Sequence, residues 1–238
     1  GQRLVTAPEV GRVLLTGSFE TAALFRSWRP DLPLLAETSG KNAIVVTPSA
    51  GLDLAVRDIV QSAFGNAGQK CSAASLAILV GTVADSERFR RQLADAVSSL
   101  AVGWPQDAGS VVGPLIEPPG RKLARALSTL DEGESWLVAP RQLDETGRLW
   151  APGVREGVAP GSEFHRTEYF GPVLGLMRAA DLDEALDLQN GVAYGLTAGI
   201  QSLDADEVAA WIDRVQAGNL YVNRPITGAI VRRQPFGG

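Results

Sequence analysis

The sequence predicts an α/β protein with a mostly parallel, twisted sheet covered by helices on both faces. Short apolar runs of strand length alternate along the chain with stretches in which apolar residues recur at helical spacing. This alternation is typical of strand–helix–strand units, which build parallel sheets. With 238 residues, of which 45% are hydrophobic, the chain is also long enough to bury a substantial core.

The elements follow one another in a regular order. Up to residue 100 we expect strands at 13–15, 32–36, 43–46 and 75–80, and helices at 19–28, 52–64 and 85–100. Ser86 is the expected N-cap of the last of these helices. Residues 103–119 are rich in Gly and Pro and are expected to run over the surface. Beyond them we expect helices at 121–130, 181–189 and 204–216, and strands at 135–139, 173–178, 197–200 and 220–222.

Composition and charge exclude several classes of function. The net charge of −5 argues against nucleic acid or an anionic membrane as the main partner. No apolar run approaches the roughly 18 residues that span a bilayer, and residues 1–4 lack the apolar stretch of a signal peptide, so we expect a cytoplasmic protein. A single cysteine, Cys71, excludes an internal disulfide, and a single histidine, His165, excludes a Cys/His zinc site; we expect no metal.

Both ends of the sequence suggest a piece of a longer protein. The first predicted strand begins almost at once, and the chain stops at 234–238 within what reads as a functional loop. We therefore treat the activity of the parent protein and the behaviour of this piece as separate questions.

Cys71 is the first candidate catalytic residue. It lies on a Gly-rich turn between a predicted helix and strand, next to Lys70, whose cation is expected to favour the thiolate. Backbone N–H groups of such a turn can also hold an oxyanion that forms when the thiolate attacks a carbonyl. The alternative is that Cys71 is simply a small buried hydrophobic residue.

A catalytic cysteine needs a base, and two residues qualify. Glu37 ends an apolar strand, where open α/β sheets place their sites, and a carboxylate there with few neighbouring charges can have a raised pKa and activate water. His165 offers a weaker alternative, a Cys/His pair of the protease type. A glutamate before a turn can also be purely structural.

Four segments together resemble the aldehyde dehydrogenase superfamily. Residues 37–42 (ETSGKN) and 68–72 (GQKCS) resemble its general-base and nucleophile motifs, with Cys71 thirty-four positions after Glu37. Residues 16–21 (TGSFET) resemble its phosphate-side turn, and 168–173 (EYFGPV) its nicotinamide-side motif. Within the superfamily, residues 61–64, 71–73, 217–224 and 227–238 are most similar to 1-pyrroline-5-carboxylate dehydrogenases, which also occur as the C-terminal part of bifunctional proline-oxidising proteins.

The resemblance implies roles for the remaining site residues. Gly17 and Ser18 would lie against the phosphates of NAD, and Glu168 and Phe170 against its nicotinamide ribose and ring. Gly228 and Ala229 would bind the carboxylate of the substrate through backbone N–H groups, with the Ser72 hydroxyl. Phe236 would pack on the aliphatic stem of the aldehyde, unless it merely fills the core. Ser39 and the pair Arg232–Arg233 depart from the family pattern.

By the same resemblance, the chain covers about the second half of a family subunit. Residues 1–39 would be the last β-α-β piece of the NAD-binding domain, and residues 40–238 the catalytic domain. We expect the parent to be a homo-oligomer that oxidises a small aldehyde bearing a carboxylate, with NAD as cofactor and NADP left open. The isolated piece should fold but be inactive. The competing hypotheses are a non-catalytic domain of this family with a structural or oligomerisation role, and a dehydrogenase of other specificity.

Overall fold

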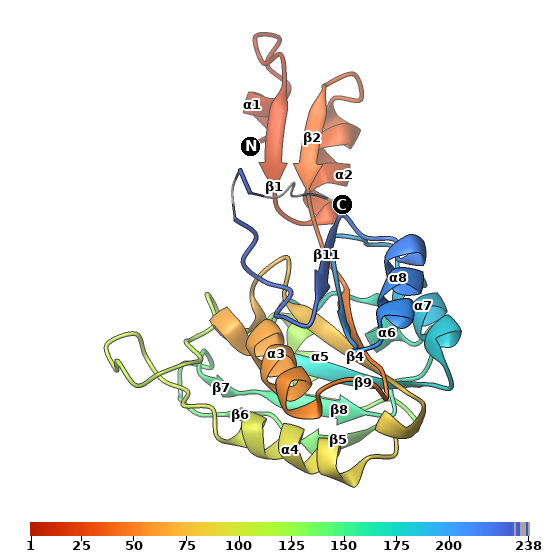
Figure 1. The fold of residues 1–238 in the computed structure, drawn as a ribbon. Helices are drawn as coiled ribbons and strands as arrows, with labels where there is room; N and C mark the ends of the chain where they lie inside the picture. Colours follow the sequence, from red (N-terminus) through yellow and green to blue (C-terminus); the bar gives the residue numbers. More distant parts are fainter. Residues whose placement is uncertain (231, 234–236, 238) are drawn as a thin grey trace.

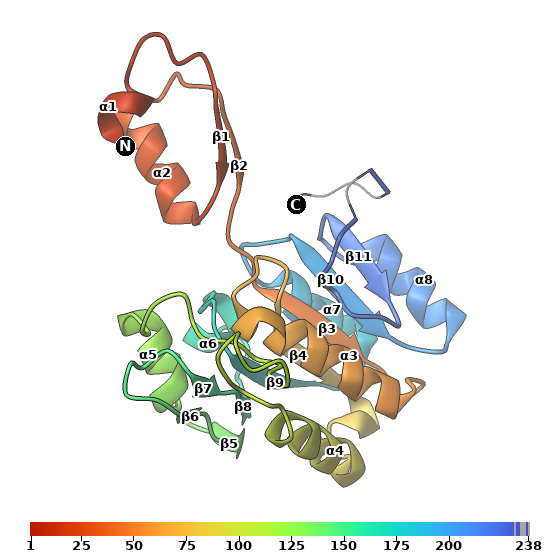
Figure 2. The same ribbon diagram turned by 90° about the vertical axis from the view of Figure 1, so that its left-hand side faces the viewer.

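The computed structural model describes residues 1–230, 232–233 and 237. Its strands form three sheets: a small parallel sheet of two strands, a large, mostly parallel sheet of seven strands, and a two-stranded antiparallel hairpin. The small sheet stands apart from the rest of the molecule, and the segment between β2 and β3 leads from one sheet into the other (Figures 1 and 2). The site described below lies beside this segment.

The small sheet is one β-α-β unit. Strand β1 (Val13–Thr16) pairs in parallel with β2 (Leu34–Glu37), with Thr16 opposite Glu37. Helix α2 (Phe19–Trp28) connects them, and a short helix, α1 (Gln2–Val5), precedes them. Ser18 caps α2 by accepting a hydrogen bond from the Thr21 amide at 3.2 Å. The carboxyl ends of both strands therefore meet the start of α2.

The large sheet has the strand order β11-β10-β3-β4-β9-β8-β5, and only β5 is antiparallel to its neighbour. Its strands are β3 (Asn42–Val46), β4 (Ala74–Val80), β5 (Ser135–Val138), β8 (Gly153–Glu156), β9 (Val173–Ala179), β10 (Thr197–Gln201) and β11 (Asn219–Val222). The central strands β3, β4 and β9 are almost entirely buried, as expected for strands with helices on both faces.

Helices cover both faces of this sheet (Figure 2). Helices α3 (Leu52–Phe64) and α4 (Glu87–Ser98) pack together on one face, and α7 (Leu182–Asn190) and α8 (Ala205–Arg214) on the other. The shorter helices are α5 (Arg121–Ser128), α6 (Glu163–Arg166) and the 3₁₀ turns η1 (Gly65–Gly68) and η2 (Gly81–Val83). Ser86 is the N-cap of α4, as predicted, and accepts a hydrogen bond from the Phe89 amide at 3.2 Å.

The predicted fold class is confirmed, but some elements were missed. The structure adds α1, the strand β8, helix α6 and a small hairpin of β6 (Arg141–Gln142) and β7 (Trp150–Ala151). Strand β8 escaped prediction because a charged residue, Arg155, lies within it. The β6–β7 pair has two residues in each strand, too few for any periodicity to show. The strand expected at 32–36 is displaced to Leu34–Glu37.

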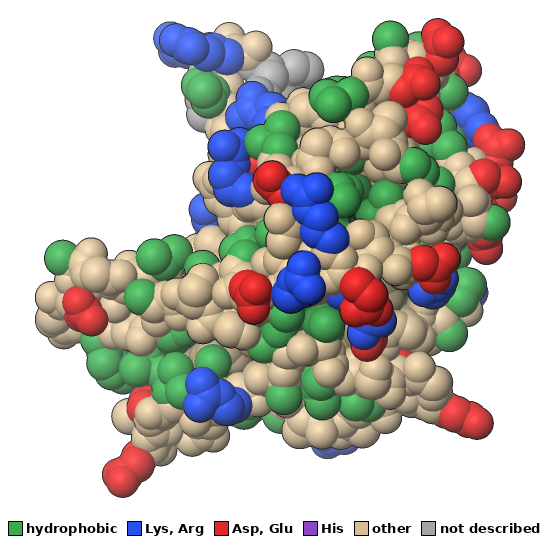
Figure 3. Space-filling view, turned by 60° about the horizontal axis from the view of Figure 1, so that its bottom comes forward, with side chains coloured by type: hydrophobic (Ala, Val, Ile, Leu, Met, Phe, Trp, Pro, Cys, Tyr) green, Lys and Arg blue, Asp and Glu red, His purple; other side chains and the backbone are tan. Residues whose placement is uncertain are grey.

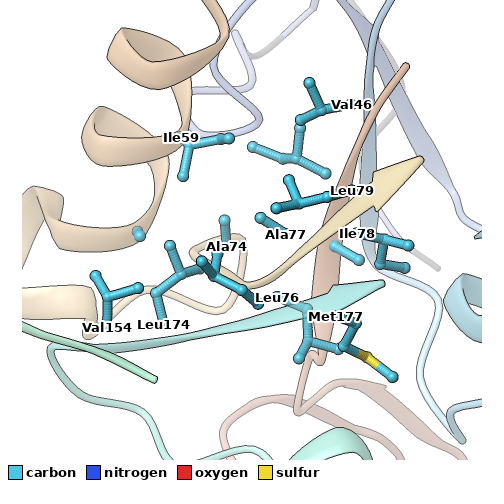
Figure 4. Packing of buried hydrophobic residues seen from close by; sticks show 14 of the residues in the cluster. Val46, Ile59, Ala74, Leu76, Ala77, Ile78, Leu79, Val154, Leu174 and Met177 are labelled. Carbon is cyan, nitrogen blue, oxygen red and sulfur yellow. The ribbon is translucent and has the colours of Figure 1, made fainter. Parts of the chain in front are cut away.

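The core is one continuous cluster formed by the strands of the large sheet and the helices on both of its faces. Side chains from β3, β4, β8, β9 and α3 interdigitate in it, including Val46, Ile59, Leu76, Val154 and Leu174 (Figure 4). Among the described residues, no helix is long and apolar enough to cross a bilayer. On the face shown in Figure 3, acidic and basic side chains are interspersed with apolar ones.

One ion pair lies inside this core. The Arg155 guanidinium contacts the Glu134 carboxylate at 2.7 Å, and both side chains are 1% exposed. Arg155 also donates hydrogen bonds to the backbone carbonyls of Ala126 and Thr129. The missed strand β8 is thereby tied to the end of α5 and the start of β5.

We expect Glu134→Ala to destabilise the protein strongly, because it leaves the Arg155 charge buried without its carboxylate. The free energy of unfolding should fall by about 3–5 kcal/mol in a denaturant titration. Asp183→Ala is the control, since its pair with Arg214 is exposed and should matter little. Equal changes in the free energy of unfolding would show that the buried pair contributes no more to stability than the exposed one.

Candidate active site

The largest cavity near the predicted residues lies between the small sheet and the turn that carries Cys71. Its volume is about 690 Å³, within the range typical of small-molecule sites. The residues that line it are Thr16, Gly17, Ser18, Glu20, Glu37, Thr38, Ser39, Gln69, Lys70, Cys71, Ser72, Lys122, Glu168, Phe170 and Gly228. Two segments far apart in the sequence, around Glu37 and around Cys71, thus share one cavity.

Glu37 is the last residue of β2, at the carboxyl end of the small sheet. Burial raises the pKa of its carboxyl, in the direction expected from its few charged neighbours. Glu37 also lines a second cavity of about 240 Å³, whose wall includes Tyr194 and Leu196. Glu37 therefore lines both cavities.

Cys71 follows a strained turn at the end of α3. In η1, Asn66 and Ala67 have left-handed backbone angles, with φ of 56° and 53°. Such angles are uncommon for residues other than glycine and recur at functional sites. The turn changes the direction of the chain between α3 and β4 and leaves Cys71 partly exposed at the cavity.

The pKa of the Cys71 thiol is raised, contrary to the expectation from Lys70. Burial is the largest cause, and the negative charges of Glu37 and Glu168 add to it. Hydrogen bonding to the backbone N–H groups of Ser72 and Cys71 acts in the opposite direction. The prediction from the neighbouring Lys70 was therefore wrong, because burial and the two carboxylates determine the direction in which the thiol pKa shifts.

The segment that joins β2 to β3 packs directly against the Cys71 turn. A Cβ atom at Gly40 would overlap the Cys71 carbonyl oxygen, so no other residue fits there without displacement. The Asn42 side-chain amide donates hydrogen bonds to the carbonyls of Cys71 and Ala73, at 2.7 and 2.9 Å. These contacts fix the distance between the two walls of the cavity.

Glu168 and Phe170 form another part of the wall. Glu168 accepts a hydrogen bond from the Gly40 amide at 2.9 Å, so the same linker positions it. Phe170 is 43% exposed and has a left-handed φ of 55°. Gln69, beside the nucleophile turn, donates a hydrogen bond to the Phe170 carbonyl at 3.3 Å. Both predicted cofactor residues on this side thus border the cavity.

The turn between β1 and α2 closes the opposite side. The Gly17 amide donates a hydrogen bond to the Glu37 carbonyl at 3.1 Å, which places Gly17 and Ser18 at the cavity. Ser39, one of the departures from the family pattern, accepts a hydrogen bond from the Phe19 amide at 3.3 Å. Its hydroxyl thereby supports the first turn of α2.

The expected substrate residues are placed only in part. Ser72 is 7% exposed and lines the cavity, as does Gly228, whereas Ala229 is not among the lining residues. Phe236 lies outside the described residues. The side chains of Arg232 and Arg233 are exposed.

The alternative Cys/His pair is not formed. His165 is 3% exposed, and both of its ring nitrogens contact the backbone: Nδ1 accepts from the Gly161 amide and Nε2 contacts the Leu188 carbonyl, each at 2.8 Å. Burial lowers the pKa of this imidazole. The histidine is a core residue with satisfied hydrogen bonds.

Several residues at the site escaped sequence reasoning. Lys122 and Gln69 line the cavity, and Asn42 braces the nucleophile turn. Lys41 is buried, and its ammonium group lies 4.1 Å from the centre of the Phe164 ring. Burial holds the pKa of this lysine well below its usual range. Lys41, Asn42 and Gln69 lie within the motifs at 37–42 and 68–72, but no role was assigned to them there.

Comparison with known proteins gives consistent matches. The aldehyde dehydrogenase family matches the chain over residues 1–238. The 1-pyrroline-5-carboxylate dehydrogenase of Geobacillus sp. (strain WCH70) is 36% identical over 247 residues, covering 100% of this chain and 48% of that protein. The chain spans about half the length of the curated relatives it matches.

Solved structures agree with this. Proline utilization A (PutA) from Corynebacterium freiburgense superposes with a TM-score of 0.96 at 57% identity, over 99% of this chain and 24% of that one. A 1-pyrroline-5-carboxylate dehydrogenase from Thermus with bound NAD gives a TM-score of 0.88 at 35% identity, over 99% and 47%. Both similarities extend over nearly the whole chain.

We expect Glu37→Gln to lower the pH at which Cys71 becomes reactive. The Glu37 charge raises the pKa of the thiol, so its removal should shift the midpoint of iodoacetamide alkylation down by a few tenths to about one pH unit. Glu20→Gln, which removes another carboxylate of the cavity wall, should leave the midpoint in place. An unchanged midpoint in Glu37→Gln would show that its charge does not act on the thiol.

Proposed function

The chain belongs to the aldehyde dehydrogenase family, and we propose from this premise that it forms the catalytic part of an enzyme that oxidises an aldehyde to a carboxylic acid with NAD or NADP. The observation that supports the proposal most is that one cavity brings together Cys71 and Glu37, a thiol and a carboxyl of raised pKa. Covalent catalysis of this kind needs both groups.

The residues around the cavity fit a nicotinamide nucleotide. The Gly17–Ser18 turn lies at the N-terminal end of α2, where the helix dipole suits phosphate oxygens, and the Glu168 carboxylate suits ribose hydroxyls. The half-exposed Phe170 ring offers an apolar surface for the nicotinamide. When bound there, the cofactor would supply the oxidising power, as the acceptor of a hydride (one proton and two electrons) from the former aldehyde carbon once sulfur is bound to it.

The protein residues perform the remaining steps. Cys71 gives up its thiol proton to solvent water, and its sulfur forms a bond to the aldehyde carbon while the carbonyl electrons move to the oxygen. Backbone N–H groups of the Cys71 turn stabilise the oxyanion. After oxidation, the acyl group remains on Cys71 as a thioester. Glu37 then accepts a proton from a water molecule, whose oxygen attacks the acyl carbon and releases the acid and the thiol.

Two features of Glu37 suit it to this role. Burial raises the pKa of its carboxyl and so brings it closer to neutral pH, where a general base works best. Glu37 also lines the second cavity, and we propose that water reaches its carboxylate from there while the aldehyde and the cofactor occupy the larger cavity.

We propose glutamate 5-semialdehyde as the substrate and glutamate as the product. The relatives named 1-pyrroline-5-carboxylate dehydrogenase and proline utilization A, at 36% and 57% identity, support this choice. Within this chain, Ser72 and the backbone of Gly228 border the cavity and can donate hydrogen bonds to a carboxylate. We further propose that the parent protein is a homo-oligomer.

We expect Cys71→Ser in a full-length protein that contains this chain to lower aldehyde-dependent NADH formation by about three orders of magnitude or more, because a serine hydroxyl is a far weaker nucleophile. Ser128→Ala, on the exposed surface of α5, is the control and should retain activity. Near-normal turnover of Cys71→Ser would remove Cys71 as the nucleophile.

We expect Gly228→Leu to raise KM for glutamate 5-semialdehyde far more than for propanal, since only the first substrate uses the donors of this loop. Gly228 has a φ of +85°, so the side chain also strains the loop. Gly133→Leu is the matched control, because Gly133 has a φ of +84° and equally open surroundings but does not line the cavity. Equal effects on both substrates would contradict the proposed carboxylate site.

A further inference from the structure

Asn42 occupies an unusual position for a polar residue, at the buried start of the central strand β3. It is 3% exposed, and its side-chain amide uses both of its donors, on the carbonyls of Cys71 and Ala73. Its oxygen accepts a hydrogen bond from the Thr197 amide on β10, at 3.0 Å. Since the partners are two acceptors and one donor, only this orientation of the amide satisfies all of them.

These hydrogen bonds fix the peptide group between Cys71 and Ser72. This peptide is trans and planar, so its C=O and N–H point in opposite directions. The C=O is held by Asn42 at 2.7 Å and confined by Gly40, whose Cα packs against it. The Ser72 N–H must therefore point away from Asn42.

This peptide group also bears on the nucleophile. The backbone N–H of Ser72 acts on the Cys71 thiol in the direction that lowers its pKa, and so opposes the effect of burial. A backbone donor on sulfur stabilises the thiolate relative to the thiol. The orientation of one peptide group thus bears on the reactivity of Cys71.

We propose that Asn42 is a positioning residue for the nucleophile: by holding the Cys71 carbonyl, it directs the Ser72 N–H toward the Cys71 sulfur. The inference rests on the proposed function, in which Cys71 attacks the aldehyde. Asn42 itself touches no reacting atom. Its contribution reaches the sulfur through the rigidity of the peptide plane.

A purely structural role for Asn42 would have a different consequence. A brace that only held the fold would, when removed, lower stability or expose Cys71 more, and alkylation would change by a similar factor at every pH. A positioning role acts on the thiolate fraction. Its loss therefore lowers the alkylation rate at neutral pH but not at a pH high enough to ionise the thiol completely.

The test is the pH profile of iodoacetamide alkylation of Cys71, measured without aldehyde or cofactor on this chain and on a full-length protein that contains it. In Asn42→Ala we expect the midpoint to rise by about one pH unit, which is a roughly tenfold lower rate at pH 7. The rate at high pH should remain within about twofold of the unsubstituted protein. Asn42→Ser, which retains one donor, should lie between the two and decides the matter if Asn42→Ala does not fold.

Thr197→Val is the matched control. It removes a neighbouring buried hydrogen bond, from the Thr197 hydroxyl to the Ser72 carbonyl at 3.3 Å, but leaves the Cys71 carbonyl on Asn42. Its midpoint should not move. The proposal is overturned if every Asn42 variant that folds keeps the midpoint of the unsubstituted protein. It is also overturned if Thr197→Val shifts the midpoint as much as the Asn42 variants do. Absence of aldehyde oxidation by the full-length protein would refute the proposed function, yet leave the alkylation result readable.

Discussion

The close packing of residues 40–42 against the Cys71 carbonyl is the contact on which the rest of the site depends. Glu37 ends the small sheet just before this segment, and Asn42 begins the central strand of the large sheet just after it. Within the segment, the Gly40 amide binds Glu168 and the Gly40 Cα packs against Cys71. One short linker thus sets the position of the candidate base, the candidate nucleophile and the carboxylate of the cofactor side.

This arrangement explains why the cavity lies where it does. The small and large sheets share no strand pairing. Without the linker contacts, nothing in the sheets would fix the positions of Glu37, Cys71 and Glu168 relative to one another. Backbone atoms and short side chains make the linker contacts, and such contacts tolerate little displacement. Beneath the linker, the rings of Phe164 and Tyr169 stack at 5.0 Å, with the buried Lys41 side chain over them. The linker is therefore held from both sides.

Local pattern was sufficient to predict most of the fold. Apolar runs predicted β3, β4, β9 and β10, because strands buried on both faces carry few polar residues. Prediction from local pattern failed where a contact between residues distant in sequence decides whether a residue is buried. Strand β8 contains Arg155, a charge that sequence alone assigns to the surface. Its burial depends on partners distant in sequence: the Glu134 carboxylate, 21 residues earlier, and the carbonyls of Ala126 and Thr129.

The residues around the cavity were likewise predictable only in part. Motif resemblance picked out Cys71, Glu37, Glu168 and Phe170, which the structure brings to one cavity. Asn42 was not recognised because its role depends on partners 29 to 155 positions away in sequence. The direction of the Cys71 pKa was predicted wrongly for a related reason. A neighbour in sequence, Lys70, was weighed, whereas burial and carboxylates distant in sequence dominate.

The proposed chemistry needs a thiolate at Cys71 and a carboxyl of raised pKa at Glu37, and the electrostatics of the cavity favour only the second. The features that suit the site to a carbonyl reaction, burial and the carboxylates of Glu37 and Glu168, all disfavour the thiolate. A cation close enough to act on the sulfur would oppose this effect, but it would also lower the pKa of Glu37 and weaken it as a base. Backbone N–H groups avoid the conflict, because their dipoles act at hydrogen-bond distance on sulfur and carry no net charge to Glu37. Stabilisation of the thiolate by the Cys71 and Ser72 amides is therefore compatible with a base of raised pKa in the same cavity, provided that the peptide between them stays correctly oriented.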